Sequence, residues 1–120
     1  MMPSKGKILI IDDEEAILKV LSIKLRVSGY GVITAPDGEK GLELAGSKKP
    51  DLILLDLVLP KTDGFRVLEK LSGRVKLPII AFSAYPENAL RAISLGVDDF
   101  IAKPFDIDVL LNKIGKLLNT

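Results

Sequence analysis

Five short apolar runs alternate with five longer amphipathic segments along this chain of 120 residues. The runs have the length of strands, and the segments carry helical periodicity or helix-end signals. Strands and helices that alternate over short connections favour an α/β domain built on a parallel sheet. The predicted strands cover residues 7–11, 31–35, 51–56, 77–83 and 99–103, and the predicted helices cover residues 14–29, 37–46, 64–73, 86–96 and 106–118.

The same pattern predicts which strands are central and where helices begin and end. The first, third and fourth strands are apolar on both faces, as central strands of a covered sheet are, whereas the strand at 31–35 is less apolar and is expected at an edge. Asp37 and Asp106 are expected to cap the second and fifth helices. Pro86 suits the first turn of the fourth helix, and Gly96 suits its end.

Length and composition exclude several classes of site. A chain of 120 residues suits one compact domain, residues 1–120, and we expect no effector domain in it. Cysteine and histidine are both absent, which excludes disulfides, thiolate zinc sites, Ser-His-Asp triads and a phosphohistidine on this chain. The net charge of +1 and the lack of a long apolar stretch or signal peptide predict a cytoplasmic protein that binds neither nucleic acid nor membrane.

One carboxylate interrupts the apolar stretch "LILLDLVLP" at residues 52–60. Burying the ionised side chain of Asp56 would be costly unless it is paired or bound to a metal. In open parallel sheets, ligands bind beyond the carboxyl ends of the strands, which is where Asp56 is predicted to lie. The alternative is that Asp56 is a turn residue ahead of "LPKTDG" at residues 59–64.

Other polar residues fall at the same end of the predicted sheet. Asp12 and Asp13 follow the first strand, Ser83 ends the fourth and Lys103 ends the fifth. If the first and third strands are neighbours, three carboxylates converge with Asp56 and repel one another unless a cation lies among them. A ligand set made only of oxygen suits Mg²⁺ or Mn²⁺. Lys103 and Ser83 would then supply a positive charge and a hydroxyl donor for a phosphoryl group on Asp56.

Each of these residues also has an ordinary structural explanation. Asp12 or Asp13 could cap the first helix, and Ser83 could satisfy a backbone group. Lys103 could be a surface lysine, and Phe100 could be a core residue. The functional interpretation is favoured because the unusual residues gather at one kind of end on four strands.

Four motifs occur in order along the chain: "ILIIDDEE", "PDLILLDLVLPKTDGFRVL", "PIIAFSA" and "GVDDFIAKPF". With these motifs the chain resembles the receiver domain of bacterial two-component response regulators, in particular single-domain regulators of the chemotaxis type. The resemblance covers essentially all 120 residues. It implies a flavodoxin-like (βα)5 three-layer sandwich, with a five-stranded parallel sheet in the strand order 2-1-3-4-5.

The resemblance also implies a role for each site residue. Asp56 would be the phosphoacceptor, and Ser83 and Lys103 would bind the phosphoryl group. Mg²⁺, with Mn²⁺ as a possible substitute, would be held by Asp12, Asp13, Asp56 and the backbone carbonyl of Val58.

Three further residues are assigned on the same basis. Phe100 would be the switch aromatic, which lacks the hydroxyl of a tyrosine and would act by ring packing alone. Lys103–Pro104 would be a cis peptide bond, and Tyr85 would modulate the access of water to the phosphoryl group.

The function implied by the resemblance is signalling. Asp56 would accept a phosphoryl group from a histidine kinase or a histidine phosphotransfer protein. The surface of the fourth helix, fifth strand and fifth helix would then switch and act on an unidentified downstream protein. Such a phosphoacceptor promotes only its own phosphorylation and dephosphorylation and is not otherwise an enzyme.

Three alternatives compete with this interpretation. A phosphatase of the haloacid dehalogenase type needs a second aspartate two residues after the nucleophile, where this chain has Val58. A dinucleotide-binding unit needs a glycine-rich turn after the first strand, and "IIDDEE" contains none. A receiver-like protein-interaction scaffold that is not regulated by phosphorylation remains open.

Overall fold

Five strands alternate with five helices in the computed structural model, which describes residues 4–59 and 62–120. The strands are β1 (Lys7–Ile11), β2 (Gly31–Ala35), β3 (Leu52–Asp56), β4 (Ile79–Ser83) and β5 (Asp99–Ala102). The helices are α1 (Glu15–Val27), α2 (Gly38–Ser47), α3 (Gly64–Arg74), α4 (Asn88–Ser94) and α5 (Ile107–Leu118). Pro60 and Lys61, in the predicted turn at 59–64, lie outside the described residues.

The strands form one parallel sheet in the order β2-β1-β3-β4-β5, which confirms the predicted topology and the predicted edge position of β2. Register brings the carboxyl ends of neighbouring strands together, because Ile11 pairs with Leu55 and Asp56 pairs with Phe82. The residues that follow β1 and end β3 and β4 therefore lie at one edge of the sheet.

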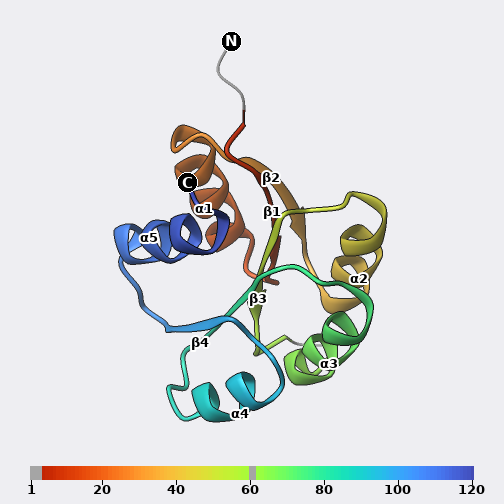
Figure 1. Cartoon of the computed structure of the whole chain (residues 1–120). Coiled ribbons are helices and arrows are strands. Elements are labelled where there is room, and N and C mark those ends of the chain that lie inside the picture. The colour runs from red at the N-terminus through yellow and green to blue at the C-terminus, as the bar shows by residue number, and fades with distance from the viewer. Residues whose placement is uncertain (1–3, 60–61) are drawn as a thin grey trace.

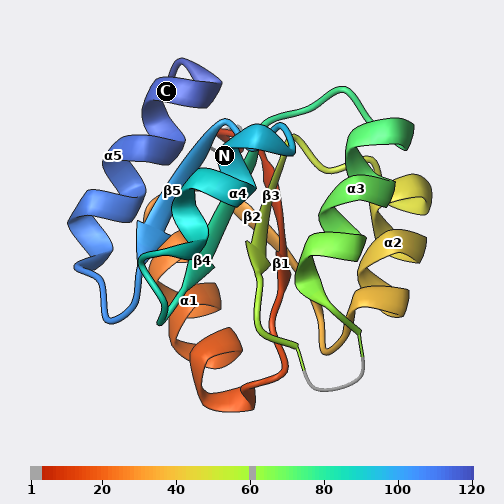
Figure 2. The same cartoon turned by 90° about the horizontal axis from the view of Figure 1, so that it is seen from below.

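Helices cover both faces of the sheet and make a three-layer sandwich. Helices α1 and α5 lie on one face, and α2, α3 and α4 lie on the other (Figures 1 and 2). Side chains alternate between the faces along each strand. In β1, Ile8 and Ile10 pack with Leu25 of α1, whereas Leu9 and Ile11 belong to the core on the opposite face.

The structure confirms the helix-end signals at three positions. The Asp37 side chain accepts a hydrogen bond from the backbone N–H of Lys40 at 2.8 Å and so caps α2. Asp106 caps α5 in the same way through the N–H of Asp108, also at 2.8 Å. Gly96 follows α4 with a φ of +102°, a left-handed conformation that favours glycine.

The predicted start of α4 is wrong by two residues. The carbonyls of Tyr85 and Pro86 accept hydrogen bonds from the N–H groups of Asn88 and Ala89, three residues on. These bonds form a tight turn that includes Pro86, so the helix begins only at Asn88.

Within residues 4–59 and 62–120, every helix is too short or too polar to cross a membrane.

Candidate functional site

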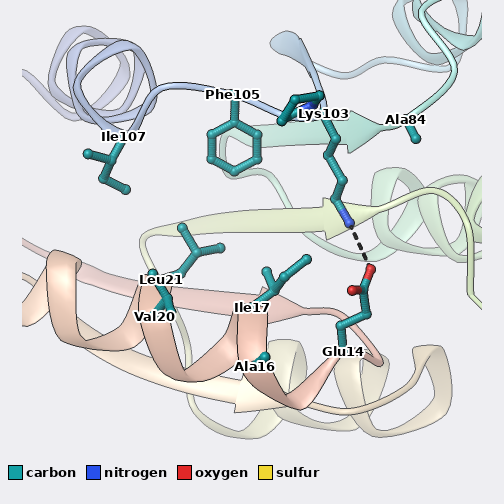
Figure 3. Close-up of a pocket in the computed structure, with 10 residues that line it drawn as sticks. Glu14, Ala16, Ile17, Val20, Leu21, Ala84, Lys103, Phe105 and Ile107 are labelled. Carbon is teal, nitrogen blue, oxygen red and sulfur yellow. Dashed lines mark ion pairs between the residues drawn. The ribbon is translucent and has the colours of Figure 1, made fainter.

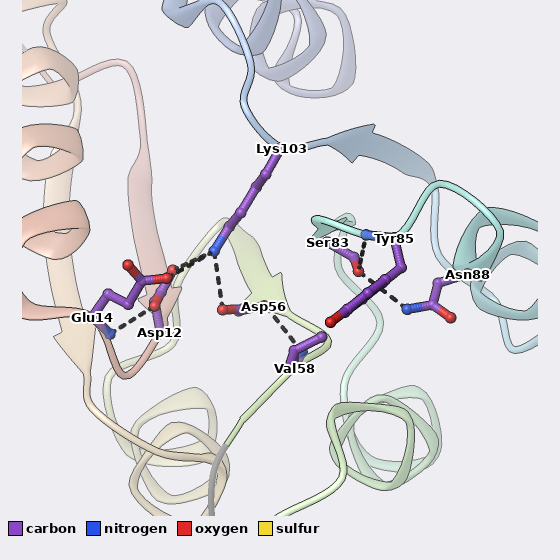
Figure 4. A network of polar contacts seen from close by, with 8 residues as sticks. All are labelled: Asp12, Glu14, Asp56, Val58, Ser83, Tyr85, Asn88 and Lys103. Atoms are coloured by element: carbon purple, nitrogen blue, oxygen red, sulfur yellow. Dashed lines mark hydrogen bonds and ion pairs between the residues drawn. The ribbon is translucent and has the colours of Figure 1, made fainter.

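Asp56 ends β3 and is almost completely buried, at 3% exposed. Its Oδ1 atom accepts a hydrogen bond from the N–H of Val58 at 2.9 Å, and its Oδ2 atom accepts one from the Lys103 ammonium at 3.1 Å (Figure 4). Burial raises the pKa of Asp56, and the two hydrogen-bond donors oppose that rise. Each oxygen of this buried carboxylate thus accepts a hydrogen bond.

Asp12 and Asp13 bring two more carboxylates to Asp56, and one oxygen of each of the three lies within 4.8 Å of the others. Asp12 is fully buried, whereas Asp13 is exposed. Burial raises the pKa of Asp12 to about 6, and the negative charge of Asp56 adds to the rise. The structure thus brings together the three carboxylates named from the sequence.

The alternative role of Asp12 or Asp13 as the N-cap of α1 is wrong. The N-cap is Glu14, and its side chain makes no capping hydrogen bond. The Oδ1 atom of Asp12 instead accepts the N–H of Glu14 at 2.8 Å, which fixes the buried carboxylate at the end of β1.

Lys103 lies directly after β5 and faces the carboxylates. Its Nζ atom is 3.1 Å from Asp56 Oδ2, 3.4 Å from Asp12 Oδ2 and 3.7 Å from Glu14 Oε1. Burial by itself would lower the pKa of Lys103, but the attraction of Asp56 and Asp12 together raises it. The peptide bond between Lys103 and Pro104 is cis.

The donor set fits a hard divalent cation. Three carboxylates converge, so every potential metal ligand among them is an oxygen atom. Lys103 pairs with two of these carboxylates. Mg²⁺ prefers such ligands, and a cation there would relieve the repulsion that helps to raise the pKa of Asp12. Asp12, Asp13 and Asp56 are therefore residues that could hold such a cation.

The residues that directly follow β3 are held close to the start of α3. Val58 forms an isolated antiparallel bridge with Asp63, just before α3. A side chain at Gly64 would collide with the backbone of Leu57, so only glycine allows this close approach. These contacts help to keep the backbone of Val58 next to Asp56, whose Oδ1 atom accepts the Val58 N–H.

Ser83 ends β4 and is fully buried. Its hydroxyl oxygen accepts hydrogen bonds from the Tyr85 N–H at 3.0 Å and from the Asn88 side-chain amide at 3.1 Å. Figure 4 shows the hydroxyl directed toward Asn88, on the side away from Asp56. In this state the serine is bonded to the segment that begins α4.

The two aromatic residues named from the sequence lie at different depths. Phe100 is half-buried on β5 and packs against the core formed with α2, α3 and α4. The side chain of Tyr85 is 53% exposed and extends from the loop after β4 in the direction of Val58 (Figure 4).

Sequence reasoning missed two residues of this network, Glu14 and Asn88. Glu14 contacts Lys103, and the acidic run "DDEE" was the available signal for it. Asn88 had no such signal, because an asparagine near a helix start is ordinary. Its role depends on the tight turn that brings the start of α4 back to Ser83.

A pocket of about 550 Å³ borders the site between α1 and the loop after β5 (Figure 3). Its wall is mainly apolar, with Ile17 and Leu21 on one side and Phe105 on the other. Lys103 and Glu14 lie at one end of it. The pocket therefore offers an apolar surface beside the carboxylate cluster.

A family model described as the response regulator receiver domain matches residues 8–115, from β1 into α5. Among curated proteins, the alkaline phosphatase synthesis transcriptional regulatory protein PhoP of Bacillus subtilis is 46% identical over 102 residues. That match covers 82% of this chain and 42% of PhoP. The DNA-binding dual master transcriptional regulator RpaA of Synechocystis is 41% identical over 117 residues, covering 93% of this chain and 48% of RpaA. The chain spans about half the length of these relatives.

Solved structures agree with the family match. The BeF3-activated N-terminal receiver domain of RstA from Klebsiella pneumoniae has a TM-score of 0.89 at 28% identity, covering 95% of this chain and 99% of that one. The response regulator TrrA from Thermotoga maritima, in complex with Mg(2+)-BeF, has a TM-score of 0.87 at 32% identity, covering 97% of this chain and 99% of that one.

Proposed function

This chain belongs to the family of response regulator receiver domains, and on that premise we propose that Asp56 accepts a phosphoryl group from a histidine kinase or a histidine phosphotransfer protein. The observation that supports this most directly is the environment of Asp56. Its carboxylate lies at the carboxyl end of a central strand, bonded to Lys103 and within 4.8 Å of Asp12 and Asp13. This carboxylate thus lies beside one positive side chain, Lys103, and two negative side chains, Asp12 and Asp13.

Residues of this chain would carry out the transfer of a phosphoryl group from a phosphohistidine of the partner to Asp56. One carboxylate oxygen of Asp56 attacks phosphorus, the new O–P bond forms as the P–N bond breaks, and the imidazole nitrogen keeps the electron pair. Lys103 and Ser83 donate hydrogen bonds to the phosphoryl oxygens. Mg²⁺ held by Asp12, Asp13, Asp56 and the Val58 carbonyl would supply further positive charge for these oxygens.

The output of the modification is a change in the surface formed by α4, β5 and α5. Once the Ser83 hydroxyl turns toward the phosphoryl group, the space it leaves becomes available to the ring of Phe100. Phosphorylation thus shifts the equilibrium between two arrangements of this surface through local packing. The partner that reads this surface is a protein or a further domain, since a net charge of +1 gives no reason for direct nucleic-acid binding.

Labelling by a small phosphodonor tests this proposal. Incubation with acetyl phosphate and Mg²⁺ should add one phosphoryl group, seen in the intact mass, and chelation of the metal should abolish the addition. Asp56→Asn should not be labelled, whereas Asp108→Asn, which changes an exposed aspartate of α5, should be labelled normally. Wild-type protein that stays unlabelled, or Asp56→Asn protein that is still labelled, would favour the unphosphorylated scaffold.

A further inference from the structure

The Ser83 hydroxyl has both of its acceptor positions occupied by groups from one short segment. The donors are the N–H of Tyr85, in the loop after β4, and the side-chain amide of Asn88, the first residue of α4. A hydroxyl oxygen has two lone pairs, so these two donors use its full accepting capacity. Figure 4 shows the hydroxyl and the Asn88 amide pointing toward each other.

Helix α4 has few other anchors. It is only seven residues long, and its N-cap, Glu87, makes no side-chain capping bond. Ala92 is the one fully buried residue among Asn88–Ser94, while Leu90 is 81% exposed. The guanidinium of Arg91 also stacks on the ring of Phe65, 4.1 Å from its centroid. Because so few side chains of α4 are buried, the hydrogen bond from Asn88 to the buried Ser83 is a substantial part of the contacts that fix the start of the helix.

We propose that Asn88 is a positioning residue for Ser83, whose amide holds the serine hydroxyl toward α4 while Asp56 is unmodified. The inference rests on the proposed phosphorylation of Asp56. Serine carries a single oxygen, so the rotation about χ1 that turns it toward a phosphoryl group on Asp56 takes it away from Asn88. Binding of the phosphoryl group by Ser83 therefore replaces the bond from Asn88 with a bond to a phosphoryl oxygen and releases the first residue of α4.

This exchange couples phosphoryl binding at Asp56 to the attachment of the start of α4, in both directions. The Asn88 bond lowers the affinity of the site for the phosphoryl group, because it must break first. By reciprocity, the phosphoryl group weakens the attachment of α4 by the same factor. One neutral hydrogen bond is worth about a fivefold change in such an equilibrium.

A double-mutant cycle with beryllofluoride, the group present in the RstA and TrrA structures, measures this coupling. Titration calorimetry in the presence of Mg²⁺ should show about fivefold tighter binding to Asn88→Ala than to wild type. Asn88→Leu, which keeps the side-chain size without a donor, should behave like Asn88→Ala. In a Ser83→Ala background the Asn88 substitutions should have no effect, and Glu87→Ala should match wild type.

A second readout follows the Asn88 side chain itself. Its amide resonances in NMR spectra should shift and lose hydrogen-exchange protection both in Ser83→Ala and on addition of beryllofluoride to the wild type. The proposed role of Asn88 would be overturned if wild type and both Asn88 variants bound beryllofluoride equally, or if the Asn88 substitutions tightened binding equally in the Ser83→Ala background. Either result would leave the proposed function of Asp56 intact. Wild-type protein that binds no beryllofluoride would instead overturn the proposed function and this exchange with it.

Discussion

The environment of Asp56 explains how a carboxylate can be placed in a buried position at the end of a strand. Burial disfavours the anion, but a backbone N–H and an ammonium group each bond to one of its oxygens. The sequence predicted this position because a lone aspartate at the end of an apolar strand needs partners. The bonding of Ser83 to Asn88 could not be predicted, since it depends on a turn whose shape the pattern does not reveal.

Substitution of Tyr85 tests whether its ring restricts access to the phosphoryl group. The exposed side chain extends toward Val58, and its ring would hinder the water that hydrolyses an acyl phosphate. Tyr85→Ala is therefore expected to shorten the phosphorylated lifetime severalfold, measured by loss of label after the phosphodonor is removed. Tyr85→Phe keeps the ring and should retain the lifetime. An unchanged or longer lifetime in Tyr85→Ala would contradict this role.

At the scale of the elements, two glycines of α2 are explained by packing. By helix propensity alone, glycine within a helix only weakens it. A Cβ at Gly41 would instead lie 2.5 Å from the Cδ1 atom of Ile11, and one at Gly38 would lie 2.5 Å from a methyl carbon of Val67. These two glycines let α2 approach β1 and α3 closely. Helical periodicity shows which face is apolar, but it does not reveal how near the neighbouring element lies.

Gly41→Ala should therefore lower the free energy of unfolding. Ile11 is fully buried in β1 and cannot move aside cheaply, so overpacking should cost about 1–3 kcal/mol and outweigh the better helix propensity of alanine. Thermal unfolding should show a lower Tm. Gly46→Ala, in the same helix with nothing within 4 Å of the added carbon, should instead raise the Tm. Equal shifts in the two variants would argue against the packing role of Gly41.

At the scale of the whole molecule, sequence alone established less of the topology than of the elements. Alternating apolar runs predicted a parallel sheet, and the weaker apolar character of β2 predicted its edge position. The order of the other strands came from family resemblance, because the sequence of an apolar strand does not indicate which strands lie beside it. That order decides the site, since the pairing of β1 with β3 is what brings Asp12 and Asp13 to Asp56.

The clustered carboxylates make the stability of the whole domain depend on pH. Asp12 has a pKa of about 6 in the folded protein against 3.8 ordinarily, so the folded state binds its proton more tightly than the unfolded state. By linkage, the contribution of Asp12 to stability is greatest at low pH and falls as pH rises through this interval. Above about pH 6 the ionised group destabilises the metal-free fold by about 3 kcal/mol. The pKa of Asp56 is raised in the same direction.

Magnesium should therefore raise the Tm at about pH 7.5 and have little effect at about pH 5, where protons compete for the carboxylates. At ten times its dissociation constant a ligand contributes about 1.4 kcal/mol, or about 5 °C for a domain of this size. Asp12→Asn should raise the Tm of the metal-free protein at the higher pH and remove the response to Mg²⁺, because it deletes a buried charge and a ligand together. Asp108→Asn should retain that response. A gain in Tm from Mg²⁺ that is equal at both pH values, or that survives in Asp12→Asn, would show that the metal acts elsewhere than at these carboxylates.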